Sequence, residues 1–209
     1  GTLTLMSSKI DKEFQLLSKK FNFNGIFKPT LTSKLLINSS INIVKNRKKI
    51  LDLGCGGGIV AGCLYKLNKK ANYFLSDISK NAVSKAKTNL KSYKGNFTFK
   101  VGDALKPWEN NKFDLIINDI SGVSNKVSKV SPWFKNVPMD KSVDGTYLLS
   151  KVLKKVSNLM DENSLIIFPI ISLCNIQKAN RIVKKNLKVI EKHKFEWPLP
   201  KSMIKDINI

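Results

Sequence analysis

The sequence predicts an α/β fold, with a doubly wound and mostly parallel sheet preceded by an N-terminal helical extension. Short segments rich in apolar and β-branched residues follow one another from Lys48 onward. Segments with helical spacing of apolar residues lie between them, and a glycine-rich turn directly follows the first. Strands and helices that alternate in this way form right-handed βαβ units, so the strands of the sheet are expected to be parallel.

The expected strands are residues 49–53, 72–77, 96–103, 112–119 and 163–170. The first, fourth and fifth are nearly continuous apolar runs, which is typical of buried parallel strands. Between the strands, a helix is expected over residues 79–90 with Ser79 at its N-cap, and another over residues 144–160. Residues 188–195 are expected to add an antiparallel strand at an edge of the sheet.

Residues 1–45 form the predicted helical extension. Within it, Ile10 and Leu17 recur on one face of a helix expected over residues 7–20. A second helix is expected over residues 30–44, because Thr and Ser occupy the N-cap positions at its start. These two helices precede the first strand of the sheet.

The composition is that of one ordinary globular domain. The chain has 209 residues, and 42% of them are apolar, which is enough for one well-buried core. No stretch without charged residues approaches the about 20 residues that a membrane-spanning helix needs. The first residues lack the basic and continuously apolar segments of a secretory signal. We therefore expect a cytoplasmic protein that is not inserted in a membrane.

Cysteine content and net charge give weaker indications. Cys55, Cys63 and Cys174 form no C-x-x-C pair, so they are expected to be reduced thiols and do not indicate a metal site. The net charge of +22 favours a nucleic-acid partner only modestly, because just Arg47 and Arg181 are arginines. Arginine is the side chain suited to bidentate recognition of phosphates and bases. A lysine-rich composition also results from AT-rich codons.

The glycine-rich turn lies where α/β sheets bind their ligands. The motif D-x-G-x-G-x-G, formed by Asp52, Gly54, Gly56 and Gly58, spans the end of the first strand. Ligands bind beyond the carboxyl ends of parallel strands, and glycines let the backbone turn sharply and approach a cofactor closely. The dinucleotide pattern G-x-G-x-x-G fits only weakly, with Ala61 in its third position. The sequence contains no P-loop motif.

On these residues the sequence resembles the class I S-adenosylmethionine (SAM)-dependent methyltransferases. The resemblance covers roughly residues 30–170. Within the class, the chain is similar to the small-domain protein-glutamine and ribosomal-RNA N-methyltransferases. The resemblance implies a Rossmann-like methyltransferase fold over residues 46–209, with residues 1–45 covering the cofactor. It also implies that SAM is the cofactor, held by Asp52 and the three glycines of the motif.

The resemblance implies further cofactor contacts at the ends of the next two strands. Asp77 is expected to bind the ribose, because two carboxylate oxygens can accept both hydroxyls of a cis-diol. Ile78 is expected to lie against the adenine face. Asp103, next to Ala104, is expected to bind the adenine amino group. In the N-terminal extension, the candidates for hydrogen bonds near the methionine carboxylate are Thr30, Thr32 and Ser33. Helix capping explains these hydroxyl residues equally well.

The fourth strand leads into the predicted transfer site. The similar N-methyltransferases carry Asn-Pro-Pro-Tyr there, or its Asp form, and the motif aligns from Asp119 or from Asn118. Both prolines and the aromatic residue are missing from this chain. Asp119 and Asn118 are the candidate catalytic residues, expected to accept hydrogen bonds from the acceptor nitrogen. Candidate substrate-binding residues are Ser121, Trp133 and Phe134. The two aromatic residues either replace the missing stacking face or are ordinary hydrophobic anchors.

Residues 121–145 are expected to form a long polar loop that binds the acceptor or remains a solvated connection. The leading interpretation is a SAM-dependent methyltransferase that acts on a nitrogen of RNA or protein. One alternative is a small-molecule methyltransferase with this loop as a lid. Another is a non-catalytic SAM-binding or RNA-binding subunit. The glycine spacing disfavours an NAD-dependent oxidoreductase.

Overall fold

The computed structural model describes residues 2–119, 146–170 and 175–188. The chain divides into two compact units. The first consists of Gly1–Ile120 with Lys155–Pro169, and the second of Ser121–Lys154 with Ile170–Ile209. The N-terminal extension therefore lies in the same unit as the sheet. The functional division of the chain at residue 45 stays a prediction.

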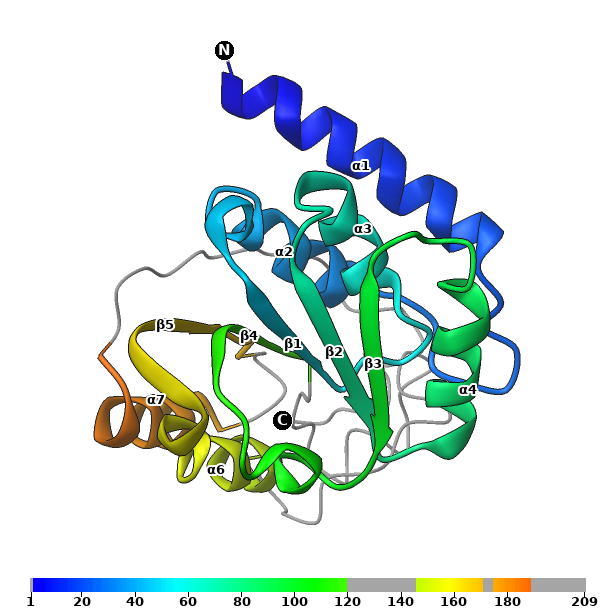
Figure 1. The fold of residues 1–209 in the computed structure, drawn as a ribbon. Coiled ribbons are helices and arrows are strands. Elements are labelled where there is room, and N and C mark those ends of the chain that lie inside the picture. The colour runs from blue at the N-terminus through cyan, green and yellow to red at the C-terminus, as the bar shows by residue number, and fades with distance from the viewer. Residues whose placement is uncertain (1, 120–145, 171–174, 189–209) are drawn as a thin grey trace, which may run out of the picture. The chain divides into compact units, whose positions relative to one another are not determined.

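The first unit is built on a five-stranded sheet in which neighbouring strands are parallel (Figure 1). In the order β3-β2-β1-β4-β5, its strands are β1 (Lys49–Leu53), β2 (Asn72–Asp77), β3 (Asn96–Val101), β4 (Phe113–Asn118) and β5 (Met160–Ile167). The chain moves outward from β1 to β3 and then returns to β4 on the other side of β1. The predicted doubly wound fold is confirmed, with its switch point between β1 and β4.

The strand register aligns the carboxyl ends of the strands along one edge of the sheet. Leu53, at the end of β1, lies opposite Ser76 of β2 and Asn118 of β4. Asp77, at the end of β2, lies opposite Val101 of β3. Residues that directly follow these strands are therefore brought together at this edge, although they are far apart in the sequence.

Helices of the first unit pack against one hydrophobic core. Helix α3 (Ile59–Leu67) connects β1 to β2, and α4 (Lys80–Asn89) connects β2 to β3. Helix α2 (Leu31–Ser40) packs against α3 and β5, and α1 (Thr2–Lys20) lies outside them against α2 and α3 (Figure 1). The core shared by these helices and the sheet includes Leu17, Leu36, Ile37, Ile50, Leu64, Tyr73 and Leu75. The N-terminal helices are thus part of the core.

Side-chain caps fix where α2 and α4 begin, as the sequence predicts. The Thr30 hydroxyl accepts the backbone N–H of Thr32 at 3.2 Å. The Ser79 hydroxyl accepts the backbone N–H of Ala82 at 3.1 Å. Each cap satisfies a backbone donor that the first turn of a helix leaves without an intrahelical partner.

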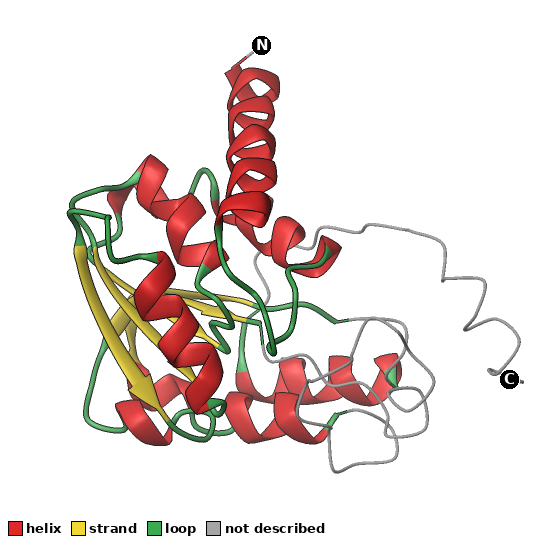
Figure 2. Cartoon of the chain, turned by 90° about the vertical axis from the view of Figure 1, so that its right-hand side faces the viewer, coloured by secondary structure: helices red, strands yellow, loops and turns green. Residues whose placement is uncertain are grey.

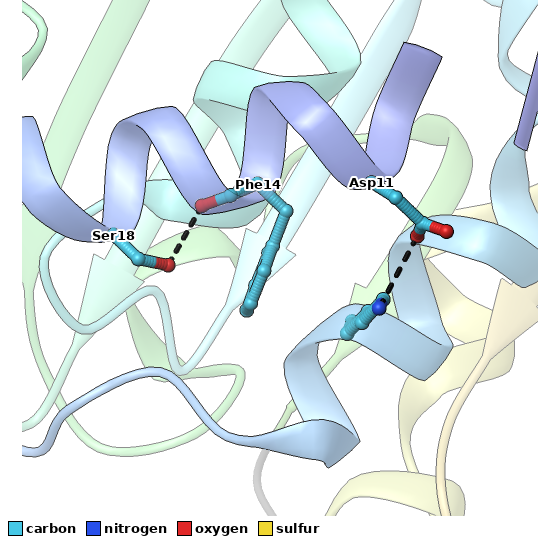
Figure 3. A network of polar contacts seen from close by, with 4 residues as sticks. Asp11, Phe14 and Ser18 are labelled. Carbon is cyan, nitrogen blue, oxygen red and sulfur yellow. Dashed lines mark hydrogen bonds and ion pairs between the residues drawn. The ribbon is translucent and has the colours of Figure 1, made fainter. Parts of the chain in front are cut away.

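Helix α1 is held by both apolar and polar contacts. Ile10 and Leu17 are buried, which agrees with the predicted helical face. Asp11 forms an ion pair with Lys34 of α2 at 3.4 Å (Figure 3). The Ser18 hydroxyl donates to the carbonyl of Phe14 at 2.7 Å within the helix (Figure 3). The ion pair connects α1 to the first turns of α2.

Aromatic side chains build a smaller cluster around β2 and β4. Trp108, in the 3₁₀ turn η2 (Lys106–Trp108), contacts the rings of Phe74 and Phe113 edge to face. Its indole N–H donates to the Ser76 hydroxyl at 2.8 Å. This bond satisfies the indole donor of a fully buried tryptophan.

The second unit contains α6 (Tyr147–Leu153) and α7 (Ile176–Asn186), which pack against each other (Figure 2). The predicted helix over 144–160 is wrong in its length. Helix α6 ends at Leu153, and the chain then forms the 3₁₀ turn η4 (Val156–Leu159) before β5. Apart from Lys188, the predicted edge strand over 188–195 lies outside the described residues.

Among the helices of the described residues, none is both long enough and apolar enough to cross a membrane.

Candidate active site

The glycine-rich turn adopts a backbone conformation that requires glycine at alternate positions. Gly54, Gly56 and Gly58 have φ angles of 76°, 51° and 88°. Side chains other than glycine rarely adopt such left-handed angles, because Cβ comes too close to the backbone. A Cβ built on Gly56 would meet no atom within 4 Å. The turn therefore borders open space at Gly56, where a ligand can approach the backbone.

The strand beside it holds the turn in place. The backbone N–H groups of Gly54 and Cys55 both donate to the carbonyl of Ser76 at 2.9 Å. The N–H of Gly56 donates to Asp77 Oδ2 at 3.0 Å, and the N–H of Ser79 donates to Asp77 Oδ1 at 2.9 Å. Asp77 thus connects the glycine turn to the start of α4. The sequence did not predict this role.

The N-terminal extension supports the turn from behind. A Cβ on Gly57 would lie 2.5 Å from Cε1 of Phe23, so the ring occupies the space that a side chain would need. The Asn89 amide donates to the carbonyls of Gly57 at 2.9 Å and Asn22 at 3.1 Å, and Asn22 N–H donates back to Asn89 Oδ1 at 2.9 Å. Sequence analysis missed these residues. The unexplained fourth glycine, Gly57, was the signal that something packs there.

Asp52 is a buried carboxylate without a hydrogen-bond partner among the described residues. Its residue is 2% exposed, and neither carboxylate oxygen has a partner within hydrogen-bonding geometry. Burial raises its pKa well above the usual value, and Asp119 and Asp77 raise it further, whereas the backbone N–H of Ala61 opposes them. An unpartnered buried charge is costly, so this site favours a ligand that brings a positive, hydrogen-bonding group.

Asp119 stands at the end of β4 and faces α2. Its backbone N–H donates to the carbonyl of Leu53 at 2.9 Å. Its Oδ2 accepts the hydroxyl of Ser33 at 3.2 Å. Burial raises the pKa of Asp119 to about 7, the Ser33 hydrogen bond lowers it, and the charge of Asp77 raises it. Asp119 is therefore partly protonated and partly ionised near neutral pH.

The two candidate catalytic residues have different surroundings. Asn118 is the last residue of β4, pairs in register with Leu53 and is 0% exposed. Asp119 directly follows the strand. The structure brings it beside Ser33 and into electrostatic contact with Asp52.

The other predicted cofactor residues lie along the same edge of the first unit. Ile78 directly follows β2 and is 52% exposed, which leaves its side chain open to a ligand. Asp103 and Ala104 lie between β3 and η2, and Ala104 has a φ of 49°, unusual for a residue other than glycine. Thr32 lies in the first turn of α2, where its N–H completes the cap. Their roles toward a cofactor stay predictions.

Three predicted substrate-binding residues, Ser121, Trp133 and Phe134, lie outside the described residues, as does the loop 121–145. Within the described ranges, no group of three or more His, Cys, Asp or Glu side chains is arranged to hold a metal ion. What the described edge offers is a glycine turn with open space beside it and several carboxylates. These groups fit SAM, which carries a positive sulfonium, an ammonium and a ribose diol.

Comparison with known proteins agrees with this geometry. A family model described as a methyltransferase domain matches residues 44–204. The chain is similar in structure to the ribosomal protein L11 methylase from Lactobacillus delbrueckii subsp. bulgaricus, with 21% identity and a TM-score of 0.56 over 75% of this chain and 68% of that chain. No curated protein matches the chain.

Two further solved structures share the fold. The precorrin-6y C5,15-methyltransferase from Geobacter metallireducens GS-15 is 12% identical, with a TM-score of 0.57 over 80% of this chain and 77% of that chain. The T. thermophilus 16S rRNA N2 G1207 methyltransferase, solved with AdoMet and guanosine, is 14% identical, with a TM-score of 0.56 over 76% and 38% of the two chains. At such identities these likenesses support the fold.

Proposed function

The chain belongs to the methyltransferase-domain family and is a SAM-dependent methyltransferase, and we propose that it methylates a nitrogen atom of RNA or protein. The observation that carries this proposal is Asp119. It is a carboxylate at the end of β4, held by Ser33 at 3.2 Å and electrostatically coupled to Asp52 and Asp77. A carboxylate in this position can accept the proton that a nitrogen loses on methylation.

The cofactor would be held by residues that, in the described contacts, still offer hydrogen-bond acceptors or open space. Asp52 offers two buried oxygens without a described partner, which suit the ammonium of the methionine part. Asp77 uses one lone pair on each oxygen for Gly56 and Ser79, so further lone pairs are left for the ribose hydroxyls. The open space beside Gly56 admits the cofactor against the turn.

When bound, SAM supplies a methyl group that is already activated on a positively charged sulfur, so a new N–C bond replaces the C–S bond and the bonding pair stays on sulfur. The protein must position the nitrogen and remove its proton. Asp119 accepts this proton on its carboxylate. Because its pKa is raised to about 7, Asp119 is a stronger base than an ordinary aspartate and is still substantially ionised at neutral pH.

The acceptor class is inferred from two proteins of the same fold and from the net charge of the chain. Two proteins of the same fold are named as a ribosomal protein methylase and a 16S rRNA methyltransferase. The chain carries 37 basic and 15 acidic residues. Four of the acids lie at or next to the carboxyl ends of the strands: Asp52, Asp77, Asp103 and Asp119. The basic net charge favours acceptors carried by a polyanion such as RNA.

A small-molecule acceptor is the second candidate. One protein of the same fold, with a TM-score of 0.57, is named as a precorrin-6y methyltransferase. On this reading the loop 121–145 would act as a lid over the acceptor. In the similar N-methyltransferases, the tetrapeptide at the end of the fourth strand stacks on planar bases or amides. Its absence from this chain is compatible with a small-molecule acceptor.

The test is transfer of labelled methyl from SAM into a fractionated cell extract. Label that nuclease removes identifies RNA or DNA as the acceptor, and label that protease removes identifies a protein. Label that passes a small-molecule filter overturns the proposed acceptor class. Asp119→Asn should lose transfer while calorimetry still detects SAM binding. Asp161→Asn, which changes an exposed aspartate of β5, is the matched control and should keep both.

A further inference from the structure

A buried hydroxyl on α2 reaches across the first unit to Asp119. Ser33 is 4% exposed, and its Oγ lies 3.2 Å from Asp119 Oδ2. The two residues are separated by 86 positions in the sequence. A hydroxyl that is buried beside a carboxylate donates its hydrogen to it, because the ionised carboxylate can only accept. The contact therefore holds Asp119 through Oδ2.

This hydroxyl is not required to cap α2. The helix begins after Thr30, whose Oγ1 already accepts the N–H of Thr32 at 3.2 Å. The carbonyl of Thr30 accepts the N–H of Lys34 at 3.2 Å, which is the first regular helical bond. Ser33 is thus placed in the first turn with a hydroxyl that is directed to a residue of another element. Capping alone does not explain why a serine is buried at this position.

The charges around Asp119 determine how much its ionised form depends on this hydrogen bond. The charge of Asp77 of β2 opposes the ionisation of Asp119, and Asp119 in turn raises the pKa of Asp52 of β1. Lys34, next to Ser33, pairs with Asp11 of α1 at 3.4 Å. The ion pairs of the described residues include none to Asp119. Before the cofactor binds, the Ser33 hydroxyl is therefore the identified side-chain donor that favours the ionised form of Asp119.

We propose that Ser33 is a positioning residue for methyl transfer, which holds Oδ2 of Asp119 and leaves Oδ1 facing the acceptor nitrogen. The inference rests on the proposed function, because it assigns Ser33 a task toward the proton-accepting group. It adds α2, and hence the N-terminal extension, to the elements that build the transfer site. The extension would then tune the base as well as cover the cofactor.

The experiment compares wild type with Ser33→Ala and with Ser33→Thr, which keeps the hydroxyl. Carbon-13 NMR of the aspartate carboxyl groups, in cofactor-free protein, follows the titration of Asp119, whose signal is identified by its loss in Asp119→Asn. Ser33→Ala should raise the pKa of Asp119 by about one pH unit, since a donor to the ionised form is lost. Ser33→Thr should restore most of the wild-type value.

The pH dependence of kcat supplies the second readout. In Ser33→Ala the acidic limb should move to higher pH by the same amount, so that activity falls about tenfold near pH 6 and much less near pH 9. An equal loss at all pH values, or an unchanged titration of Asp119, would overturn the inference. If Ser33→Ala does not fold, Ser33→Cys replaces it. The thiol is a weaker donor of similar size, so a smaller shift of the Asp119 pKa is expected.

The two readouts separate this inference from the proposed function. The NMR titration needs no turnover, so an unchanged pKa refutes the role of Ser33 even when the enzyme methylates RNA or protein. Conversely, if Ser33→Ala shifts the pKa but no extract fraction accepts label, the proposed function fails. The positioning role toward transfer then fails with it, and only the local hydrogen bond remains.

Discussion

Acidic residues at the two ends of the same sheet differ in their hydrogen-bond partners. At the amino ends of the strands, the Asp114 carboxylate accepts the backbone N–H groups of Lys48 at 2.7 Å and Lys49 at 2.9 Å. Arg47 completes this end by donating from Nη1 to the carbonyls of Asp114 at 3.0 Å and Asn163 at 2.9 Å. Here the charged side chains of Asp114 and Arg47 both have partners that belong to the fold.

At the carboxyl ends, Asp77 is likewise held by the backbone N–H groups of Gly56 and Ser79, but Asp52 and Asp119 are not held in this way. Asp52 has none among the described residues, and Asp119 accepts one neutral hydroxyl. Burial raises the pKa of both carboxyl groups. Because a protein gains nothing in stability from a buried charge without a partner, such a group indicates a ligand. Acids whose hydrogen bonds are satisfied within the fold indicate structure instead.

The sharpest test of this contrast is Asp52→Asn. Removing the negative charge should weaken SAM binding by about 100-fold, because a charge-assisted hydrogen bond to the ammonium is lost. The free energy of unfolding of the cofactor-free protein should rise at pH 8, since the cost of a buried unpaired charge disappears. Calorimetry and denaturant unfolding measure the two quantities. A variant that binds SAM as wild type does would exclude Asp52 from the cofactor site.

The opposite result is expected for Asp114→Ala at the other end. The N–H groups of Lys48 and Lys49 lose their partner, so the free energy of unfolding should fall by about 1–3 kcal/mol. The affinity of the folded protein for SAM should stay unchanged. If SAM binding weakened as strongly as in Asp52→Asn, the two ends would not be functionally distinct.

The carboxyl end should also make SAM binding depend on pH. The pKa values of Asp52, Asp77 and Asp119 are all raised, with burial as the largest cause. A cationic ligand favours the ionised carboxylates, so its affinity should fall as pH decreases through the raised pKa values of these groups, of which that of Asp119 is about 7. The fall should be about tenfold per pH unit for each carboxylate that must lose its proton. Calorimetry in buffers of different ionisation enthalpy measures the protons released. A constant affinity from pH 5.5 to 8.5 would contradict this linkage.

Stability of the cofactor-free protein should change in the opposite sense. A carboxyl group with a raised pKa in the folded state binds more protons than it does in the unfolded chain, whose aspartates titrate at about 3.9. These three groups therefore favour folding most at low pH, and each contribution is lost as pH rises through the raised pKa of that group, which is about 7 for Asp119. The midpoint of thermal unfolding should show it, and Asp52→Asn should flatten the dependence.

The local features of this edge could be predicted from the sequence. Gly54, Gly56 and Gly58 were recognisable because a left-handed backbone selects glycine at each position. Asp77 and Asp119 were recognisable because they follow apolar runs and thus fall at strand ends. These signals depend on neighbours in the sequence and need no knowledge of the fold.

Features that depend on contacts between distant segments could not be predicted in the same way. The hydrogen bond from Ser33 to Asp119 and the bridge from Asn89 to Gly57 form only after α2 and α4 pack. The predicted length of the helix over 144–160 was wrong for another reason. Val156 and Leu159 are buried in a 3₁₀ turn, where apolar residues keep a spacing close to that of an α-helix.

The support of the glycine turn gives a smaller expected effect. Asn89→Ala removes hydrogen bonds to Asn22 and to the Gly57 carbonyl, so the turn should be less well ordered and SAM affinity should fall about fivefold. Thr88→Ala is the matched control, because the Thr88 hydroxyl donates to the Ser84 carbonyl within α4. Equal SAM affinities of the two variants would show that the bridge does not support the site.

The smallest effect is expected at Ala104, on the same carboxyl edge. Its φ of 49° is the only positive value of a residue other than glycine among the described ranges. Ala104→Gly relieves about 1 kcal/mol of backbone strain but adds a similar amount of freedom to the unfolded chain. Denaturant unfolding should therefore show a change within about 0.5 kcal/mol. Ala71→Gly, at a buried position without a positive φ, should lose about 1 kcal/mol. A loss at Ala104 as large as at Ala71 would mean that burial of its methyl group outweighs the relief of backbone strain.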